Sequence, residues 1–451
     1  MKISYNRIIN RIIWAIGIVG IMAVAPFFAS FAHADHEFGT TGYLRFGAGL
    51  SGPTEERACY KAPNANWKYR LGNECDTWTE IGPNYTYRPH GEDGPVFYGR
   101  WWLAVFAPEG RQNELDFDTT ELFIETSNIQ FLGKSTKFWV GRKYYQRFQT
   151  HLNDFWWLMM LGDGFGIEEI DVSFGKILYA YTRNSASVDL NEAGTLRGEA
   201  FQNNHDLRLY GLPVGFSAKP NLSLQVAFSH SAGNDGAFTE SGAVSVANAA
   251  TSTYGFSFAA WHEESFDFLF NRLSIQYGRG ITRNNFDGNN PDTVLTTTSD
   301  AADDLLSAYI VRVTEDLILM PDKRWAVMLN AIFQKEDGGD YDDRDRTWYS
   351  LGIRPYWFLD KNFRLLAEYG FDRTDDKSSD LKGNLHKLTL AGEVAADYGV
   401  WNRPVIRAFF TFAAWSDSFR GQVGSSGTNN PTECNTRTDC FSAGVQIEYW
   451  W

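Results

Sequence analysis

Many segments of this chain alternate between apolar residues and polar or small ones with a period of two. In Leu222–Ser229 every even-numbered residue is apolar and every odd-numbered one is small or polar, and Phe363–Asp372 follows the same rule with one exception, Leu366. The alternating runs are about 8 to 11 residues long, which suits tilted strands that cross a membrane. The pattern predicts strands with one apolar and one polar face, and it outnumbers any helical periodicity.

The connections between these runs alternate in length. Two of the short turns are Lys219–Asn221 and Leu359–Lys361. The long polar connections include Ser231–Thr253, Thr282–Ala302, Lys335–Arg346 and Asp417–Thr438. Short turns at one rim and long loops at the other are typical of an outer-membrane barrel. We therefore predict an all-β fold, a transmembrane antiparallel β-barrel of about 16 to 20 strands. The alternative, a soluble β-sandwich, would not need so many strands with a charged second face.

The N-terminal segment has the pattern of a secretory signal. Lys2, Arg7 and Arg11 precede an apolar stretch from Ile12 to Ala32, and Ala32-His33-Ala34 forms a small-x-small cleavage site. We predict a signal peptide over residues 1–34 and a single barrel domain over residues 35–451. An uncleaved helical anchor is the alternative, because the apolar stretch is long, but the cleavage site weighs against it.

Composition narrows the function further. The 451 residues include 41 Lys and Arg against 55 Asp and Glu, a formal net charge of -14, and 16% aromatic residues. The acidic excess argues against a nucleic-acid partner. The mean hydropathy of -0.34 excludes a polytopic helical membrane protein. The aromatic content excludes a disordered chain.

The four cysteines predict two disulfides. Cys59 and Cys75 bracket one polar loop, and Cys434 and Cys440 bracket another. Neither spacing matches a redox or zinc motif. In an exported protein, short disulfides that each close a loop are favoured over free thiols.

Motifs for cofactors, metals and catalysis are incomplete. Gly133–Thr136 ends like a phosphate loop, but Asn128 occupies the position of its first glycine. His262-Glu263 begins a zinc-protease motif, but Phe266 replaces its second histidine. We predict no cofactor, no metal site and no catalytic residue.

The C-terminal segment Ala443–Trp451 alternates strictly. Its odd positions from Val445 to Trp451 are apolar, so the even positions, which include Trp450, are predicted to face the polar lumen. A last strand that ends in an aromatic residue resembles the recognition signal read by outer-membrane assembly machinery.

Six segments, in matching order, resemble motifs of the maltoporin family. They are Trp67–Cys75, Gly141–Arg147, Ile170–Lys176, Gly352–Pro355, Trp401–Arg407 and Tyr449–Trp451. The resemblance extends from Tyr43 to Trp451. It implies an 18-stranded barrel in the outer membrane of a Gram-negative cell, in contact with membrane lipid. It also implies a homotrimer and passive diffusion of maltose and maltodextrins.

Maltoporins guide sugars along a line of lumen aromatics, the aromatic slide. Transferred by local motif, this slide is expected at Tyr43, Trp78, Phe270, Trp401 and Trp450. Parity offers a second indication, because each of the first four shares its face with a nearby charged residue. These pairs are Tyr43 with Arg45, Trp78 with Glu80, Phe270 with Arg272, and Trp401 with Arg403 and Arg407. Aromatics of the membrane girdle, the alternative, would share the apolar face instead.

The family also flanks its slide with charged residues that exchange hydrogen bonds with sugar hydroxyls. The resemblance places this charged track at Arg45, Arg70, Glu80, Arg147 and Asp154. The alternative for each of them is an ordinary polar porin lumen.

Several positions depart from the family pattern. His151–Trp157 matches an inward-folded constriction loop, but Trp156 occupies the position of a family tyrosine at the narrowest point. Gln149 replaces an expected Asp, and Ile124 aligns with an expected Arg. A tryptophan that a neighbouring subunit lends to the slide has no clear counterpart, and Phe117 is the nearest match. These departures leave the preferred sugar open.

Two alternatives from other classes are a porin for another sugar or of low selectivity, and an outer-membrane enzyme barrel. A phosphate-type porin would need a ladder of Lys and Arg rather than a line of aromatics. An enzyme barrel would need a nucleophile and a base in a recognisable motif, which the sequence lacks.

Overall fold

The computed structural model describes residues 35–51, 55–91, 94–108, 115–131, 133–189, 197–217, 219, 221–232, 236–239, 242–245, 253–284, 306–339, 345–424, 434 and 436–451. The predicted signal peptide lies outside these residues and remains a prediction. Within the described part of the chain, no helix is long and apolar enough to cross a membrane.

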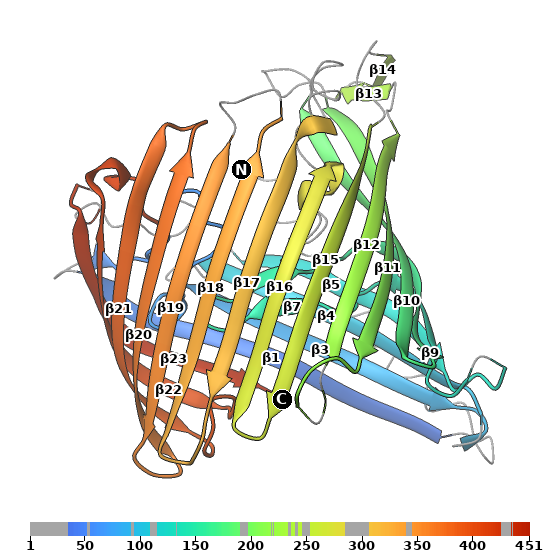
Figure 1. The fold of residues 1–451 in the computed structure, drawn as a ribbon, viewed down its shortest axis with the longest axis horizontal. Helices are drawn as coiled ribbons and strands as arrows, with labels where there is room; N and C mark the ends of the chain where they lie inside the picture. Colours follow the sequence, from blue (N-terminus) through green and yellow to red (C-terminus); the bar gives the residue numbers. More distant parts are fainter. Residues whose placement is uncertain are drawn as a thin grey trace.

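Within these residues, eighteen antiparallel strands form one closed barrel (Figure 1). They are β1 (Asp35–Ser51), β3 (Asp76–Arg88), β4 (Val96–Pro108), β5 (Asp116–Ser127), β6 (Lys137–Arg142), β9 (Asp163–Val172), β10 (Gly175–Asp189), β11 (Arg197–Leu212), β12 (Asn221–Ala232), β15 (Thr253–Phe266), β16 (Leu269–Gly280), β17 (Tyr309–Leu319), β18 (Trp325–Asp337), β19 (Arg346–Phe358), β20 (Phe363–Asp376), β21 (Leu381–Ala395), β22 (Val405–Trp415) and β23 (Asp439–Trp450). Each pairs with its neighbours along the chain, and β1 pairs with β23 to close the barrel. The predicted fold class and the strand number implied by the resemblance are confirmed.

The remaining described elements are short. They are β2 (Glu55–Glu56), β7 (Phe148–Thr150), β8 (Phe155–Leu158), β13 (Gly236–Thr239), β14 (Gly242–Ser245) and the 3-10 turns η4 (Ile281–Asn284) and η7 (Asp417–Phe419). Of these, β7 and β8 pair only with each other, in a small sheet separate from the wall.

The period-two pattern sorts the side chains as the sequence predicts. On β12, Ser223 and Gln225 are buried toward the lumen, whereas Val226 and Phe228 are 55% and 46% exposed on the outer face of the wall. Because every second residue points outward, the outer face collects the apolar residues that lipid requires.

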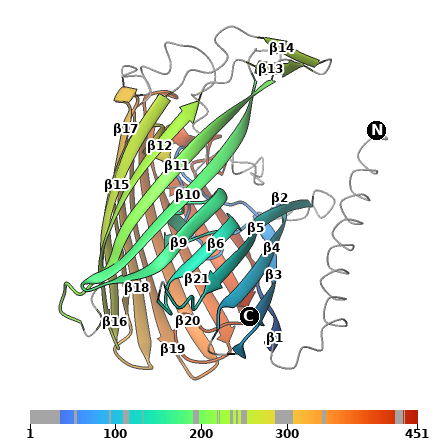
Figure 2. The ribbon, with the colours of Figure 1, turned by 90° about the vertical axis from the view of Figure 1, so that its right-hand side faces the viewer.

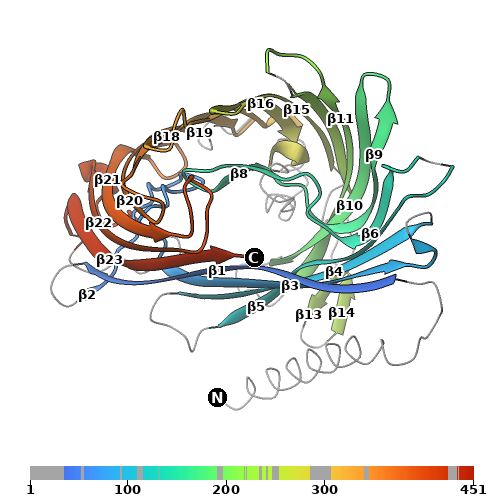
Figure 3. The same ribbon diagram turned by 90° about the horizontal axis from the view of Figure 1, so that it is seen from below.

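Two long connections fold into the barrel and narrow it. We call residues 57–75, between β2 and β3, the inner loop, and residues 143–162, between β6 and β9, the constriction loop. The constriction loop carries β7 and β8, and Figure 3 shows β8 crossing the lumen. The inward fold of the constriction loop was predicted from the resemblance. The inward fold of the inner loop was not.

The inner loop is fixed by a disulfide and by one tyrosine. The predicted Cys59–Cys75 disulfide closes it, and the predicted Cys434–Cys440 disulfide is also present. Tyr69 lies flat against Gly352 of β19 and Gly370 of β20, where an added Cβ would come within 2.1 Å of its ring. Its hydroxyl group hydrogen-bonds to the Ser350 hydroxyl group at 2.8 Å. The two glycines therefore allow the loop to lie close to the wall.

The constriction loop is held by side chains of the wall that donate to its backbone carbonyl groups. These contacts are Arg208 to Gln146 at 2.7 Å, Arg272 to Gln149 at 3.3 Å, Arg354 to Leu152 at 3.3 Å, Gln276 to Trp157 at 2.6 Å and Arg312 to Trp157 at 3.3 Å. The donors come from four strands, β11, β16, β17 and β19. Buried carbonyl groups of a loop need such partners, because water cannot reach them. Several lumen arginines are thus supports of the loop.

Aromatic side chains of the wall and of the loop also pack together and support the constriction loop. Phe148 lies 5.4 Å from Trp157 and 5.1 Å from Trp261 of β15 between ring centroids, and Trp157 lies 5.9 Å from Trp261. Rings at these separations add stabilisation beyond their buried area. The loop therefore rests on an aromatic base as well as on the arginines.

Removing both donors to the Trp157 carbonyl group should loosen the constriction. In the double variant Gln276→Leu and Arg312→Leu this buried carbonyl group loses its two wall donors, which costs about 1 to 3 kcal/mol. We expect more current noise and more brief closures in single-channel recordings, with the barrel still assembled. Lys335→Gln, on the outer face, is the control and should leave the noise unchanged. Equal noise in all three proteins would contradict the supporting role.

Candidate functional site

The first part of the site consists of two neighbouring rows of aromatic and charged side chains on three adjacent strands. Tyr43 of β1 lies directly opposite Trp450 of β23 and Glu80 of β3. One step along, Arg45 lies opposite Glu448 and Trp78 on the same strands. Residues directly opposite each other share a face and lie about 5 Å apart. Each of the three strands therefore contributes one aromatic and one charged side chain to this patch, which we call the slide patch.

The slide patch faces the lumen. Arg45 forms ion pairs with Glu74 at 2.8 Å and Asp76 at 2.6 Å, and Glu74 belongs to the inner loop inside the barrel. The hydroxyl group of Tyr43 donates to Glu448 at 3.0 Å and accepts from Arg70 at 3.0 Å. Expected slide and track residues thus meet in one network.

Arg70 lies at the centre of this network. Its guanidinium group contacts Glu74 at 2.5 Å, Glu448 at 3.1 Å and Asp154 of the constriction loop at 3.7 Å. Burial opposes the ionisation of Asp154 and raises its pKa, while the positive charge of Arg70 acts to lower that pKa. Although burial also opposes the ionisation of Glu74, Arg45 and Arg70 hold its pKa below the ordinary value. The inner loop, the constriction loop and the wall are joined here by paired charges.

Two further arginines complete the pairing of Glu448. Its Oε2 atom accepts from Arg403 at 2.9 Å and from Arg407 at 3.0 Å. The Arg403 guanidinium group also lies 4.3 Å from the ring centroid of Trp450. Glu448, Glu74 and Arg403 were not named as site residues from the sequence. The parity that placed Trp450 in the lumen also indicated Glu448, two residues earlier on the same face.

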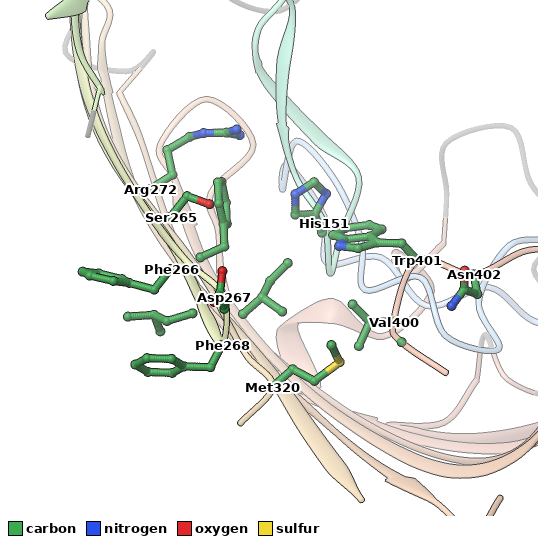
Figure 4. Close-up of a pocket in the computed structure, with 14 residues that line it drawn as sticks. His151, Ser265, Phe266, Asp267, Phe268, Arg272, Met320, Val400, Trp401 and Asn402 are labelled. Carbon is green, nitrogen blue, oxygen red and sulfur yellow. The ribbon is translucent and has the colours of Figure 1, made fainter. Parts of the chain in front are cut away.

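The second part of the site lies at the short-turn rim. A pocket of about 660 Å³ is lined there by Phe270, Arg272, Trp401 and His151, among others (Figure 4). The His151 ring lies 4.3 Å from Trp401 and 6.3 Å from Phe270, and Arg272 lies 5.0 Å from the Phe270 ring. Phe270 and Trp401, far apart in the sequence, thus meet around one imidazole.

The parity argument for Trp401 is wrong. Trp401 precedes the start of β22 at Val405 and lies in a turn, where period-two alternation does not apply. Its ring reaches the lumen because this turn brings it against His151, as Figure 4 shows. Phe270 and Arg272, by contrast, are strand residues of β16, as the parity argument requires.

His151 was missed as an individual site residue. Burial lowers its pKa to about 3, and the positive charges of Arg272, Arg70 and Arg354 lower it in the same direction. The imidazole is therefore neutral near pH 7, with one donor and one acceptor nitrogen. A neutral ring between two aromatics offers a polar contact without adding charge to the lumen.

The constriction carries a stacked arginine. The Arg147 guanidinium group lies 4.5 Å from the ring centroid of Tyr144 and 4.3 Å from that of Trp156. The pKa of Tyr144 is raised to about 12, mainly by burial; the charge of Arg147 opposes this shift and that of Glu80 adds to it. Arg45 and Glu80 belong to the slide patch, and Arg70 contacts it. Arg147 and Asp154 lie in the constriction loop. All five residues of the expected charged track therefore lie around the slide patch and the constriction.

Ile124 does not lie in the lumen. It is 64% exposed on the outer face of β5, whereas its neighbour Phe123 is buried on the other face. The register between β4 and β5 shifts between Trp102 and Leu103, and Thr120 is the extra residue on β5. A bulge of this kind reverses the parity of everything after it. The alignment of Ile124 with a lumen arginine is therefore wrong, and Ile124 cannot alter the charged track.

The structure also locates Gln149 and Phe117, two further positions at which the sequence departs from the family pattern. The carbonyl group of Gln149 accepts from Arg272 in the lumen. Phe117 precedes the bulge and is 57% exposed. In the described residues no group of three or more His, Cys, Asp or Glu side chains is placed to hold a metal ion.

Comparison with known proteins agrees with this architecture. A family model described as LamB porin matches residues 38–451. The outer membrane channel DcaP of Acinetobacter baumannii is 8% identical, with a TM-score of 0.50 over 94% of this chain and 99% of that one. OccD3 (OpdP) of Pseudomonas aeruginosa is 9% identical, with a TM-score of 0.46 over 93% and 92%. An anion-selective porin from Comamonas acidovorans is 11% identical, with a TM-score of 0.44 over 92% and 100%.

At 8% identity the likeness to DcaP concerns the barrel fold alone. The family match covers almost the whole barrel, together with the inner loop and the constriction loop. The chain is therefore an outer-membrane β-barrel porin and belongs to the LamB porin family.

Proposed function

We propose that this porin gives facilitated passive diffusion to maltose and maltodextrin-type oligosaccharides. The observation that carries the proposal is the slide patch, in which Tyr43, Trp78 and Trp450 lie beside Arg45, Glu80 and Glu448 on three paired strands. The sugar rings stack on the aromatic residues while their hydroxyl groups exchange hydrogen bonds with the charged ones.

The chemistry of the patch suits a pyranose chain. One face of a glucose ring is rich in C–H bonds and stacks on an aromatic ring, whereas its equatorial rim carries hydroxyl groups. Weak sites in series allow a sugar to advance without being trapped, as conduction requires. The pocket of Phe270, Trp401 and His151 supplies further contacts of the same kind at the short-turn rim.

The pairing of the lumen charges favours a neutral solute. Arg45, Arg70 and Arg403 each contact at least one carboxylate at 3.1 Å or less. An anion porin would instead offer guanidinium groups without such partners. A porin for a different sugar, or one of lower selectivity, remains the second candidate, because Trp156 and Gln149 alter the constriction.

We also propose a homotrimer in the outer membrane. The outer face of β3 carries Thr77 and Thr79, which alternate with the lumen residues Trp78 and Glu80. On β12 the outward residues are instead large and apolar, such as Val226 and Phe228. The next outward residue of β3, Ile81, is 47% exposed, so only the part of β3 next to the inner loop is less apolar than β12 and suits contact with other copies of the chain. Phe117, on nearby β5, would then be the aromatic lent to a neighbour.

The first prediction concerns block of ion current. Maltohexaose added to a planar bilayer that contains the protein should block the current reversibly, with an affinity between micromolar and millimolar. The stacked sugar occupies the lumen and excludes hydrated ions. Block should be compared with an inert polymer of similar size and with hexasaccharides of other linkages. If maltohexaose gives no block, or no more than the polymer, selective binding is wrong.

A second prediction concerns the stacking surface. Trp450→Ala should weaken maltohexaose block about fivefold, since loss of one ring stack removes about 1 kcal/mol. Trp450→Phe should retain most of the block. Trp357→Ala is the matched control, because Trp357 of β19 is 64% exposed on the outer face.

Barrel assembly must be followed in the same variants. A shift in gel migration between heated and unheated samples reports the folded barrel. If Trp450→Ala assembles normally and binds as tightly as the unaltered protein, Trp450 has no place in the slide. If instead its assembly fails while Trp357→Ala assembles, the residue serves the C-terminal assembly signal.

A further inference from the structure

A polar row crosses three strands on the outer face of the wall. Arg183 of β10 lies directly opposite Asn203 of β11, which lies opposite His230 of β12. The three strands run side by side (Figure 2). All three side chains point outward, because the alternating residues Thr182, Asn204 and Ser229 are buried toward the lumen. We call Arg183, Asn203 and His230 the outer polar row.

The outer polar row marks the edge of the apolar band. One step toward the short-turn rim, the outward positions on the same strands are Tyr181, His205 and Phe228. The next step brings Tyr179, Leu207 and Val226. The outward side chains therefore become more polar toward the long-loop rim. The row that contains Tyr181 and His205 lies between the apolar row and the outer polar row. Such a transition is expected at the boundary between acyl chains and headgroups.

Each member of the outer polar row keeps a donor available. The Tyr181 hydroxyl group donates to Asn203 Oδ1 at 2.7 Å, which occupies the amide oxygen and not the amide nitrogen. The Arg183 guanidinium group stacks over the Phe201 ring at 4.0 Å, so its N–H edges stay open. His230 Nδ1 is buried and cannot reach a headgroup, which leaves Nε2 as the ring nitrogen that can donate. Its ring is held by His205, stacked at 5.8 Å with 17° between the planes.

Arg183 also has no carboxylate within ion-pair distance in the described part of the chain. The nearest candidate by register is Asp163 of β9, directly opposite Arg183. Asp163 is already bound by Arg142 of β6 through two hydrogen bonds, of 2.9 and 3.1 Å. One positive charge in the outer polar row is therefore uncompensated.

We propose that the outer polar row binds the phosphate group of a lipid headgroup in the leaflet at the long-loop rim. A guanidinium group, an amide and an imidazole, each about 5 Å from the next across three strands, match an anion that accepts several hydrogen bonds at once. The apolar outward residues below the row contact the acyl chains of the same lipid. Inorganic phosphate would meet the donors but not this second surface, so the occupant is a lipid.

The test is lipid retention by the purified protein, measured by native mass spectrometry. The probe is lipid A with both phosphates, compared with lipid A from which the phosphates have been removed. Arg183→Gln should lower retention of the phosphorylated lipid about fivefold, the change expected for loss of one cation near an anionic headgroup. Asn203→Leu should lower it in the same direction. Retention of the dephosphorylated lipid should be low for every protein.

Arg373→Gln is the matched control. Arg373 of β20 is another outward-facing arginine, and its guanidinium group donates to Asn384 Oδ1 at 3.3 Å. Its loss should leave retention unchanged. Heat-modified gel migration confirms that each variant is folded, and Asn203→Leu carries the test if Arg183→Gln does not fold. The proposal is overturned by equal retention in all variants, by an equal loss in Arg373→Gln, or by equal retention of dephosphorylated lipid. Displacement of the bound lipid by millimolar inorganic phosphate would also overturn it.

Discussion

The register between β1 and β23 is the constraint on which the rest of the structure depends. It closes the barrel, and it sets Tyr43 opposite Trp450 and Arg45 opposite Glu448. A shift by one residue would turn one of the two strands inside out, because successive side chains point to opposite faces. The aromatic residues would then face lipid and the apolar residues would face water. Closure of the barrel and assembly of the slide patch are therefore the same event.

The second constraint is the cost of charge in a narrow lumen. A buried ion needs a partner, and breaking a buried pair costs about 3 to 5 kcal/mol. Glu448 meets this need with Arg70, Arg403 and Arg407, which come from the inner loop, a turn and β22. The pairing ties segments far apart in the sequence to the β1–β23 seam. It also leaves a surface rich in donors and acceptors, in which carboxylates compensate the charges of Arg45, Arg70 and Arg403.

The strands and their faces could be predicted from the sequence, because period-two alternation is a local property. The same rule places Trp450 and Glu448 in the lumen, and the outward faces of β10 to β12 follow from it. It fails at two positions for physical reasons. Trp401 lies in a turn, where side chains do not alternate, and Ile124 follows a bulge that reverses the parity of β5.

Contacts between segments that are distant in the sequence could not be predicted from this local alternation. Tyr69 rests on Gly352 and Gly370, and nothing local to residue 69 indicates two glycines that lie on distant strands, roughly 300 positions away. The wall side chains that hold the constriction loop appear in the sequence as ordinary polar residues of the lumen face. Only the fold shows that Arg312 and Gln276 share the carbonyl group of Trp157. His151 is similar, since its partners Phe270 and Trp401 lie on separate elements.

A structure of the protein with bound maltotriose tests the central claim most directly. The account predicts glucose rings stacked on Tyr43 and Trp450, with sugar hydroxyl groups within hydrogen-bond distance of Arg45 or Glu80. Sugar bound only against the opposite wall, or no ordered sugar at saturating concentration, would contradict it.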